Sequence, residues 1–435
     1  MTNTNKYYRA REEALLALVS IEEGLWAKEA LDKFTDSGDK ALSTEITYGT
    51  LQNKLLLDYI LGFYLEYPLQ KLTPQIRNIL RSSLYQLQFL DRMPPKKVIY
   101  DAVRLAGRFG HKGVQRLVSG VLNSVLREKR WTLPEATLER LSIQYSHPLW
   151  LVKRWYQDLG VRETEDLLKW NNKRHDLCVR VNTLVTTPEE YSRVLTDLGI
   201  AFRVDPEIKQ ALYIAKSGSV LEMPHFSEGA IQPQSKASML AAIALDPKPG
   251  EMIADLCAAP GTKTGYLAEL MLNTGHITAI DLSLDRLDLA KKNLERLKVK
   301  NVEFLVADAT QVNLPLQDRI LVDVPCSGLG TLSHRPDARY HKTEASLLEL
   351  PKLQLSILER AAYLLKPGGI LVYSSCTTEK RENSNVIELF LKENNNFYEE
   401  EIPLIRGLYR DKYGYQSYSH KTDTDGFYYC RLRKR

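Results

Sequence analysis

The stretch MIADLCAAPGTKTGYLAEL at residues 252–270 decides the fold of the C-terminal half of this chain. Its apolar start predicts a strand, the small residues around Gly261 predict a tight turn, and the remainder predicts a helix. Small residues let a backbone approach a ligand closely, and the amides at a helix start attract a negative group. Because the turn has neither the Walker A nor the GxGxxG pattern, it alone identifies no ligand.

From about residue 236 onward, strand and helix patterns alternate. This alternation of short apolar strands with helices predicts a parallel, doubly wound sheet, and so a Rossmann-like α/β domain at 236–435. The predicted strands are 252–257, 276–281, 302–307, 319–324, 370–376 and 427–433.

Three aspartates stand at the ends of successive predicted strands: Asp281, Asp308 and Asp323. Ligands bind outside the carboxyl ends of the strands in such sheets, so the three carboxylates are expected along one ligand-binding edge. An acid after the second strand suits a ribose diol. The turn and the acids together predict an adenosine-containing, positively charged cofactor such as S-adenosylmethionine. For any one aspartate, the alternative is a turn or helix-capping role.

Two cysteines also follow predicted strands, Cys326 in LVDVPCSGLGTL (321–332) and Cys376 in GILVYSSCTTEK (369–380). The chain has only five cysteines, which are far apart and never form CxxC, so no disulfide framework and no metal site is predicted. A strand-end thiol can be a nucleophile, or it can simply fill a small buried space.

The N-terminal part has a different pattern. Residues 1–140 predict a bundle of amphipathic helices, with helix starts at Ser43 and at Thr73. Residues 141–235 predict a small α+β module with a strand in DLCVRVNTL (176–184) and a helix capped by Thr187.

Basic residues are concentrated in the helical part. The net charge is +5, but residues 71–130 alone hold 13 Lys or Arg and three acids. Such a block favours an anionic partner, most often nucleic acid, and the alternative is a solvated helical surface. No apolar run is long enough to span a membrane, and the N-terminus has no secretion signal. We therefore expect a cytoplasmic protein with free thiols and no membrane partner.

Three motifs resemble those of the Sun-type RNA cytosine-5 methyltransferases. They are DLCAAPGTKT (255–264), DVPCSGLGTL (323–332) and YSSCTTEKRENSNVI (373–387). The resemblance covers nearly the whole chain, since residues 1–140 are similar to the NusB-like, RNA-binding extension of the RsmB-type bacterial 16S rRNA enzymes.

The resemblance implies a role for each residue of the reaction site. Cys376 is expected to attack carbon 6 of cytosine, and Cys326 to assist release of the product. Asp323 is expected to contact the N3/N4 edge of the ring, with Lys263 anchoring Asp323 or the cofactor end of the site. The residues expected to bind S-adenosylmethionine are Cys257, Ala258, Ala259, Pro260, Gly261, Thr262, Lys263, Asp281, Arg286, Asp308 and Asp323.

The implied substrate is a cytosine in 16S rRNA, either free or within a 30S assembly intermediate, and the enzyme is expected to be a monomer. One alternative keeps the chemistry but changes the substrate to tRNA, another RNA or DNA. A second alternative is a non-catalytic RNA-binding ribosome assembly factor. The helical part is expected to bind RNA, with a protein partner as the alternative.

Overall fold

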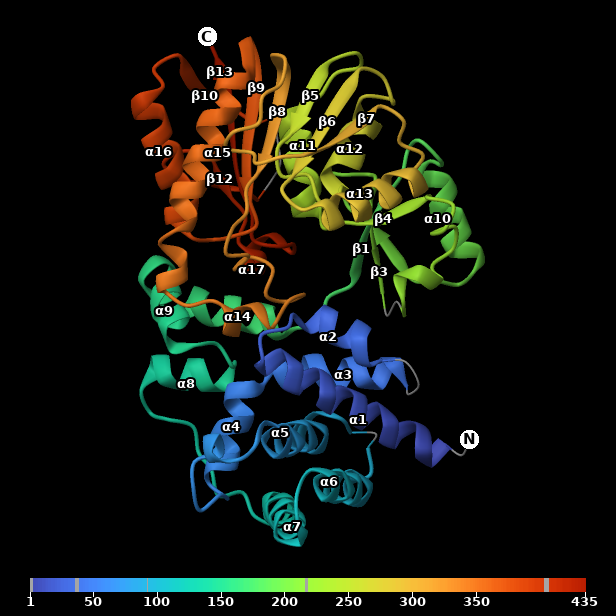
Figure 1. Cartoon of the computed structure of the whole chain (residues 1–435), viewed down its shortest axis with the longest axis vertical. Coiled ribbons are helices and arrows are strands. Elements are labelled where there is room, and N and C mark those ends of the chain that lie inside the picture. Colours follow the sequence, from blue (N-terminus) through green and yellow to red (C-terminus); the bar gives the residue numbers. More distant parts are fainter. Residues whose placement is uncertain (1–2, 36–38, 92, 216–217, 403–406) are drawn as a thin grey trace. The chain divides into compact units, whose positions relative to one another are not determined.

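The computed structural model describes residues 3–35, 39–91, 93–215, 218–402 and 407–435, which form two compact units (Figure 1). Unit 1 comprises Met1–Lys173 and Leu332–Glu344, and unit 2 comprises Arg174–Thr331 and Ala345–Arg435. The division of the chain into three domains at residues 140 and 235 stays a prediction.

Unit 1 is all-helical. Its core is built from the apolar stripes of several helices, with Leu15, Leu57, Leu80 and Leu122 fully buried. Among the described residues, no helix is long and apolar enough to cross a membrane. The helices are α1 (Asn3–Glu22), α2 (Ala27–Phe34), α3 (Lys40–Gln52), α4 (Lys54–Gly62), the 3-10 helix η1 (Leu69–Lys71), α5 (Pro74–Phe89), α6 (Pro95–Phe109), α7 (Lys112–Arg127), α8 (Thr137–Gln144), α9 (Leu149–Asn172) and α14 (Ala338–His341).

The two predicted helix starts had different outcomes. Thr73 caps α5 by accepting a hydrogen bond from a first-turn amide, and Pro74 is the first helical residue, as predicted. The start at Ser43 is wrong, because Asp39 caps α3 and the helix begins at Lys40. Ser43 lies inside that helix, where its Oγ donates to Glu13 Oε2 at 2.9 Å.

A segment from the C-terminal half of the sequence completes unit 1. In Leu332–Glu344, the Arg339 side chain is fully buried, and its Nη1 donates to Ser146 O at 3.1 Å and Asn172 Oδ1 at 3.0 Å. The Tyr340 hydroxyl donates to Ser146 O at 3.0 Å. Both side chains thus bond to Ser146 or Asn172 of the helical unit, so the segment is a structural part of that unit.

Unit 2 begins with a small four-stranded sheet of order β2-β3-β1-β4, all pairs antiparallel. The predicted cap at Thr187 is confirmed, as part of a capping box with Glu190. A buried ion pair between Arg180 and Glu269, 2.6 Å apart, joins the small sheet to helix α12 (Thr262–Leu270). The elements are β1 (Leu177–Val181), α10 (Pro188–Asp197), β2 (Phe202–Val204), β3 (Ala211–Ile214), the 3-10 helix η2 (Val220–Glu222) and β4 (Ile231–Pro233).

The rest of unit 2 is built on a mixed sheet of order β11-β12-β13-β9-β8-β5-β6-β7, with β10 paired to β13. Its strands are β5 (Met252–Asp255), β6 (His276–Asp281), β7 (Val302–Val306), β8 (Gln317–Asp323), β9 (Leu365–Ser375), β10 (Phe397–Glu400), β11 (Tyr409–Arg410), β12 (Tyr415–Gln416) and β13 (Tyr428–Lys434). The helices are α11 (Lys236–Leu245), α12 (Thr262–Leu270), α13 (Leu284–Arg296), the 3-10 helices η3 (Ala345–Leu347) and η4 (Lys380–Glu382), α15 (Leu350–Leu364), α16 (Ser384–Glu393) and α17 (Ser419–Thr422).

The prediction of a parallel, doubly wound sheet needs one correction. Strands β5 to β9 pair in parallel, but β13 runs antiparallel to β9, with Tyr428 opposite Ser375. Strand β10 pairs antiparallel with β13 and therefore carries the chain back to the carboxyl edge, from which β13 enters the sheet.

Helices cover both faces of this sheet (Figure 1). Alternate residues of one strand belong to different cores: Ile320 and Val322 pack with α15 and α16 on one face, and Leu321 packs with α11 and α12 on the other. Burial on both faces holds the strand ends, where the predicted site residues lie, in a fixed arrangement.

Candidate active site

The turn after β5 brings together residues 257–262, which the sequence predicted to bind a cofactor. Gly261 has a φ of +87°, and a Cβ atom there would lie only 3.1 Å from the Cβ of Ala290, so the turn requires glycine. The Ala259–Pro260 peptide is cis, and Gly261 N donates to Ala258 O at 2.7 Å.

Side chains beneath the turn support it. Asp255 ends β5 with 1% of its surface exposed, and its Oδ2 accepts a hydrogen bond from Thr264 Oγ1 at 2.8 Å. Burial raises the pKa of this carboxyl group to about 7. Burial also raises the pKa of the Cys257 thiol, which packs against the core. The backbone oxygen of Thr262 accepts from Arg180 Nη1 at 3.0 Å. The Cys257 side chain thus packs against the core, although its backbone belongs to the turn.

Asp281 links the β5 turn to the end of β6. Its Oδ2 accepts from Ala259 N at 3.2 Å, and its Oδ1 accepts from Ser283 N at 3.2 Å and Arg286 Nη1 at 3.3 Å. Arg286 Nη2 also donates to Ala259 O at 2.7 Å. The structure therefore brings Asp281 and Arg286 to the predicted cofactor turn.

Asp308 is exposed, just beyond the end of β7. Its Oδ1 accepts from both the backbone N and the Oγ1 of Thr310 at 2.8 Å, and the backbone bond is the main cause that lowers the pKa of Asp308. These bonds hold its own turn, so the structure places Asp308 at the predicted edge without linking it to the other site residues.

Asp323 and Lys263 form the charged centre of the site. Lys263 Nζ lies 2.6 Å from Asp323 Oδ2, and Ser374 Oγ donates to Asp323 Oδ1 at 2.7 Å. Burial acts to lower the pKa of Lys263, but the Asp323 carboxylate outweighs it and the net pKa is raised. Lys263 therefore stays protonated. Its charge also interacts with Cys376.

The two cysteines are in direct contact. Cys326 Sγ lies 3.2 Å from Cys376 Sγ, although the residues are separated by 50 positions in the sequence. Beside them, the hydroxyls of Ser327 and Thr377 are 2.8 Å apart, and Gly330 N donates to Cys376 O at 3.0 Å. The hydrogen bond to Cys376 and burial both raise the pKa of Cys326, so Cys326 keeps its proton at neutral pH.

Comparisons with known proteins identify the family of this chain. Residues 242–433 match the family model described as 16S rRNA methyltransferase RsmB/F. The probable ribosomal RNA small subunit methyltransferase B of Bacillus subtilis (strain 168) is 36% identical over 444 residues, or 98% of each chain. This chain belongs to the RsmB/F family of 16S rRNA methyltransferases.

Two solved structures are similar to most or much of this chain. The crystal structure of PH0851 has a TM-score of 0.85 and 31% identity, and the match covers 98% of this chain and 99% of that one. NSun6 from Pyrococcus horikoshii, solved with SFG, has a TM-score of 0.61 and 25% identity over 66% of this chain and 98% of its own.

The predicted domain types of this RsmB/F member are confirmed. Residues 8–127 match the NusB family, and residues 147–221 match the ferredoxin-like domain of RsmF/B-like methyltransferases. The C-terminal part has the predicted α/β methyltransferase fold, with the antiparallel strands noted above.

Glu382 holds the Cys326 loop, and no sequence pattern had indicated this role. This fully buried carboxylate accepts from Ser327 N at 2.9 Å and from Gln354 Nε2 at 3.0 Å. Gln354 Nε2 also donates to Pro325 O at 3.0 Å. Burial raises the pKa of Glu382. In the sequence it stands in the charged run EKRE (379–382), which is typical of an exposed helix start, so only the tertiary fold identifies it.

The other cysteines lie outside the thiol pair. Cys430 is fully buried in β13, and Cys178 packs against the core between the small sheet and α11. Across the described ranges, no group of three or more His, Cys, Asp or Glu side chains is arranged to hold a metal ion.

Proposed function

We propose that this RsmB/F-family chain methylates carbon 5 of a cytosine in 16S rRNA, with S-adenosylmethionine as donor and a covalent Cys376–C6 adduct as intermediate. The observation that carries the proposal is the contact of the two thiols, 3.2 Å apart, beside the Lys263–Asp323 pair. Two thiols and an ion-paired carboxylate, all at one edge of the sheet, suit a reaction that must both form and break a carbon–sulfur bond.

The residues around the β5 turn fit the methyl donor. Asp281 accepts three N–H groups, and a carboxylate has about four acceptor positions, so one remains for a ribose hydroxyl. The turn presents no bulky side chain, because Ala258, Ala259 and Gly261 form it. We propose that these residues hold S-adenosylmethionine, with Cys257, Pro260, Thr262, Lys263, Arg286, Asp308 and Asp323 contributing. When bound, the donor supplies an electrophilic methyl group.

Carbon 5 of cytosine is a poor nucleophile until a thiolate adds to carbon 6. We assign this attack to Cys376, because its segment YSSCTTEK resembles the nucleophile motif of the family and the charge of Lys263 interacts with it. The Cys326 thiol can then donate a hydrogen bond to the Cys376 thiolate, and the Lys263 ammonium stabilises the same negative charge.

Asp323 would contact the N3/N4 edge of the ring. As the Cys376–C6 bond forms, electron density moves to N3, and the Asp323–Lys263 pair would supply a proton there. The same pair takes this proton back when the carbon–sulfur bond breaks. Ser374 fixes Asp323 by its bond to Oδ1.

Release requires loss of the proton on carbon 5, followed by expulsion of the Cys376 thiolate. Once Cys376 is bonded to carbon, the hydrogen bond that keeps the proton on Cys326 is lost. Cys326 can then give its proton to water, and its Sγ can accept the carbon 5 proton. This step restores the C5=C6 bond and returns Cys376 to its starting state.

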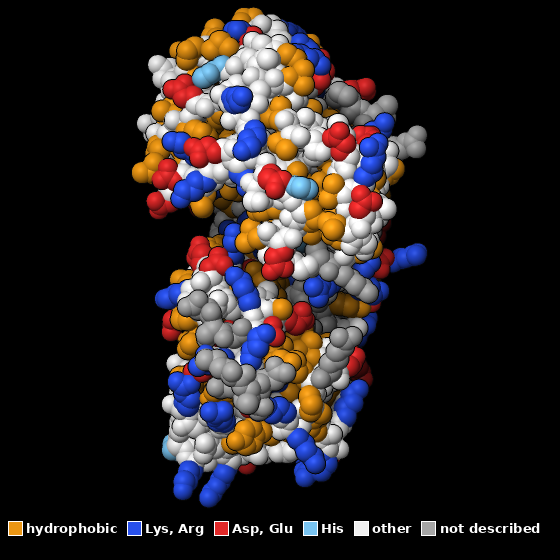
Figure 2. All heavy atoms as spheres, turned by 90° about the vertical axis from the view of Figure 1, so that its right-hand side faces the viewer, with side chains coloured by type: hydrophobic (Ala, Val, Ile, Leu, Met, Phe, Trp, Pro, Cys, Tyr) orange, Lys and Arg blue, Asp and Glu red, His pale blue; other side chains and the backbone are white. Residues whose placement is uncertain are grey.

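Exposed cations on unit 1 suit an RNA substrate. Figure 2 shows Lys and Arg side chains projecting from the helical unit. Exposed basic residues of the 71–130 block are Lys71, Lys96, Arg104, Arg108, Lys112, Arg116, Arg127, Lys129 and Arg130. We propose that this surface contacts rRNA phosphates, free or in a 30S intermediate, and that the enzyme acts as a cytoplasmic monomer.

The experiment uses the full chain, labelled S-adenosylmethionine and undermethylated 16S rRNA. Cys376→Ala should abolish both methyl transfer and the covalent protein–RNA adduct. Cys326→Ala should accumulate the adduct, because release fails. The reverse pattern would overturn the two roles. Equal methyl transfer to tRNA would overturn the assignment of 16S rRNA as the substrate. Absence of methyl transfer to any RNA would favour a non-catalytic assembly factor.

A further inference from the structure

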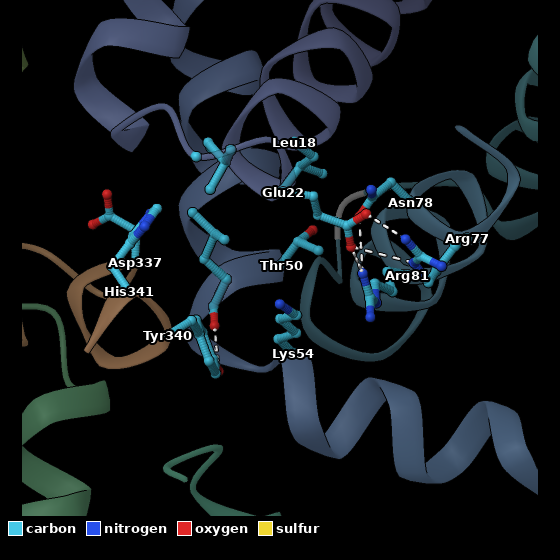
Figure 3. Close-up of a pocket in the computed structure, with 13 residues that line it drawn as sticks. Leu18, Glu22, Thr50, Lys54, Arg77, Asn78, Arg81, Asp337, Tyr340 and His341 are labelled. Atoms are coloured by element: carbon cyan, nitrogen blue, oxygen red, sulfur yellow. Dashed lines mark hydrogen bonds and ion pairs between the residues drawn. The ribbon is translucent and has the colours of Figure 1, made fainter. Parts of the chain in front are cut away.

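Unit 1 contains a cavity of about 320 Å³ that the reaction described above does not use. It lies among α1, α3, α4, α5 and the 332–344 segment, and Figure 3 shows its lining side chains. Its volume falls at the lower end of the range of small-molecule sites, about 300–1,000 Å³. The cavity is therefore large enough for a small ligand.

One side of the cavity carries an excess of positive charge. Arg77 Nη2 lies 2.7 Å from Glu22 Oε2, and Arg81, which also pairs with Glu22, donates from Nη2 to Asp58 Oδ2 at 2.7 Å. Lys54 stands beside these pairs, so the cluster has three cations and two carboxylates. A partly buried group of this composition attracts an anion.

Lys54 is the cation that remains available. In the part of the chain that the structure describes, its Nζ makes no hydrogen bond or ion pair, and it lies 4.7 Å from the centre of the Tyr340 ring. Burial, and next the charge of Arg81, lower its pKa. An anion bound next to Lys54 would offset both effects by its opposite charge.

Thr50 gives a second, independent indication of a ligand. Its side chain is only 1% exposed and lines the cavity, and Oγ1 has no hydrogen-bond partner within the described residues. Figure 3 shows Thr50 between Lys54 and Glu22. A buried hydroxyl without a partner costs stability, so an occupant that bonds to Oγ1 would remove that cost.

The other side of the cavity is apolar and aromatic. Tyr340 and His341 lie there beside the Asp337 carboxylate, whose Oδ2 accepts a hydrogen bond from Ala27 N at 2.8 Å, and Leu18, Ile21 and Leu51 add apolar surface to the lining. In Figure 3, Tyr340 and His341 lie on the side opposite Arg77 and Arg81. A ligand that satisfies both sides must carry a negative group at one end and a flat, partly apolar group at the other.

We propose that this cavity binds a nucleoside 5′-phosphate, as one residue of an RNA strand or as a free nucleotide. The phosphate would accept hydrogen bonds from Lys54 Nζ and Thr50 Oγ1, and the base would lie against the apolar side. Binding is measured without a methyl donor, so its outcome is independent of the methyl-transfer chemistry proposed above.

The test is calorimetric titration of the full chain with uridine 5′-monophosphate, which avoids the cytosine and adenosine that the catalytic site should accept. We expect it to bind more tightly than inorganic phosphate or uridine. Lys54→Gln should weaken binding by about tenfold or more, because a charge-assisted hydrogen bond contributes about 1.5–3 kcal/mol. The nearly isosteric Thr50→Val should weaken it a few-fold, and the control Lys153→Gln, at an exposed position on α9 away from the cavity, should leave it unchanged.

A competition experiment distinguishes the two sources of the nucleotide. Displacement by a short single-stranded oligouridylate assigns the cavity to an RNA strand, and no displacement assigns it to a free nucleotide. Failure of wild-type protein to bind the nucleotide would overturn the proposal. So would equal affinity in the wild type, in Lys54→Gln and in Thr50→Val, or an affinity for inorganic phosphate that matches that for the nucleotide.

Discussion

Replacement of Lys263 by Met tests whether its ammonium group activates the thiol pair. The substitution keeps the length of the side chain but removes the charge 2.6 Å from Asp323 Oδ2, a charge that also interacts with Cys376. One nearby opposite charge changes the pH at which a group ionises by about 1–3 units. We therefore expect adduct formation at neutral pH to slow by roughly 10- to 1,000-fold, and its pH profile to move upward by a similar 1–3 units.

The assay is single-turnover formation of the covalent adduct with an RNA that contains 5-fluorocytosine, measured across a range of pH. Lys263→Arg, which keeps the charge, should recover part of the rate, and Lys392→Met on the exposed face of α16 should change nothing. Urea unfolding checks that each variant is folded. An unchanged rate and pH profile in folded Lys263→Met would refute the reasoning.

Three further predictions concern buried groups. Because burial raises the folded-state pKa of Asp255 to about 7, above its unfolded value of about 3.9, the folded state binds the extra proton and wild-type stability should fall as pH rises from 4 to 7. Asp255→Asn should remove this fall, which we expect to be roughly 3–5 kcal/mol in the free energy of unfolding measured by urea titration at both pH values. An equal fall in the variant and the wild type would contradict this prediction. Glu269→Gln should destabilise unit 2 by about 3–5 kcal/mol, because Arg180 is left buried and unpaired, and unchanged urea midpoints would exclude this. Glu382→Gln should lower the free energy of unfolding by about 1.5–3 kcal/mol and slow product release, which would be seen as accumulation of the adduct. Adduct levels equal to those of the wild type would show that the Cys326 loop does not need the Glu382 carboxylate.

The elements that were predicted correctly depend on local patterns. The β5 turn and the helix caps at Thr73 and Thr187 each need only a few neighbouring residues, and all three are present. The meeting of Cys326 with Cys376 was also predictable, because parallel strands place their carboxyl ends at one edge.

The features that were not predicted depend on packing between residues far apart in the sequence. The direction of β13 depends on where the chain returns to the sheet after β10, which no local pattern gives. Glu382 has the sequence context of a surface residue, and only the packing of α15 and η4 buries it. Arg339 likewise stands in a polar stretch, RPDARY (335–340), yet it is fully enclosed by the helical unit.

The inserted segment that carries Arg339 has a consequence for synthesis of the protein. A ribosome that adds about 5–20 residues per second needs on the order of 10–30 s to proceed from Lys173 to Glu344. Throughout that interval, Ser146 O and Asn172 Oδ1 lack the guanidinium that later bonds to them. The helical unit is thus the first part of the protein to emerge and among the last to be finished. In a nascent chain halted within this interval, proteases should therefore cleave the helical unit more readily than in the finished protein.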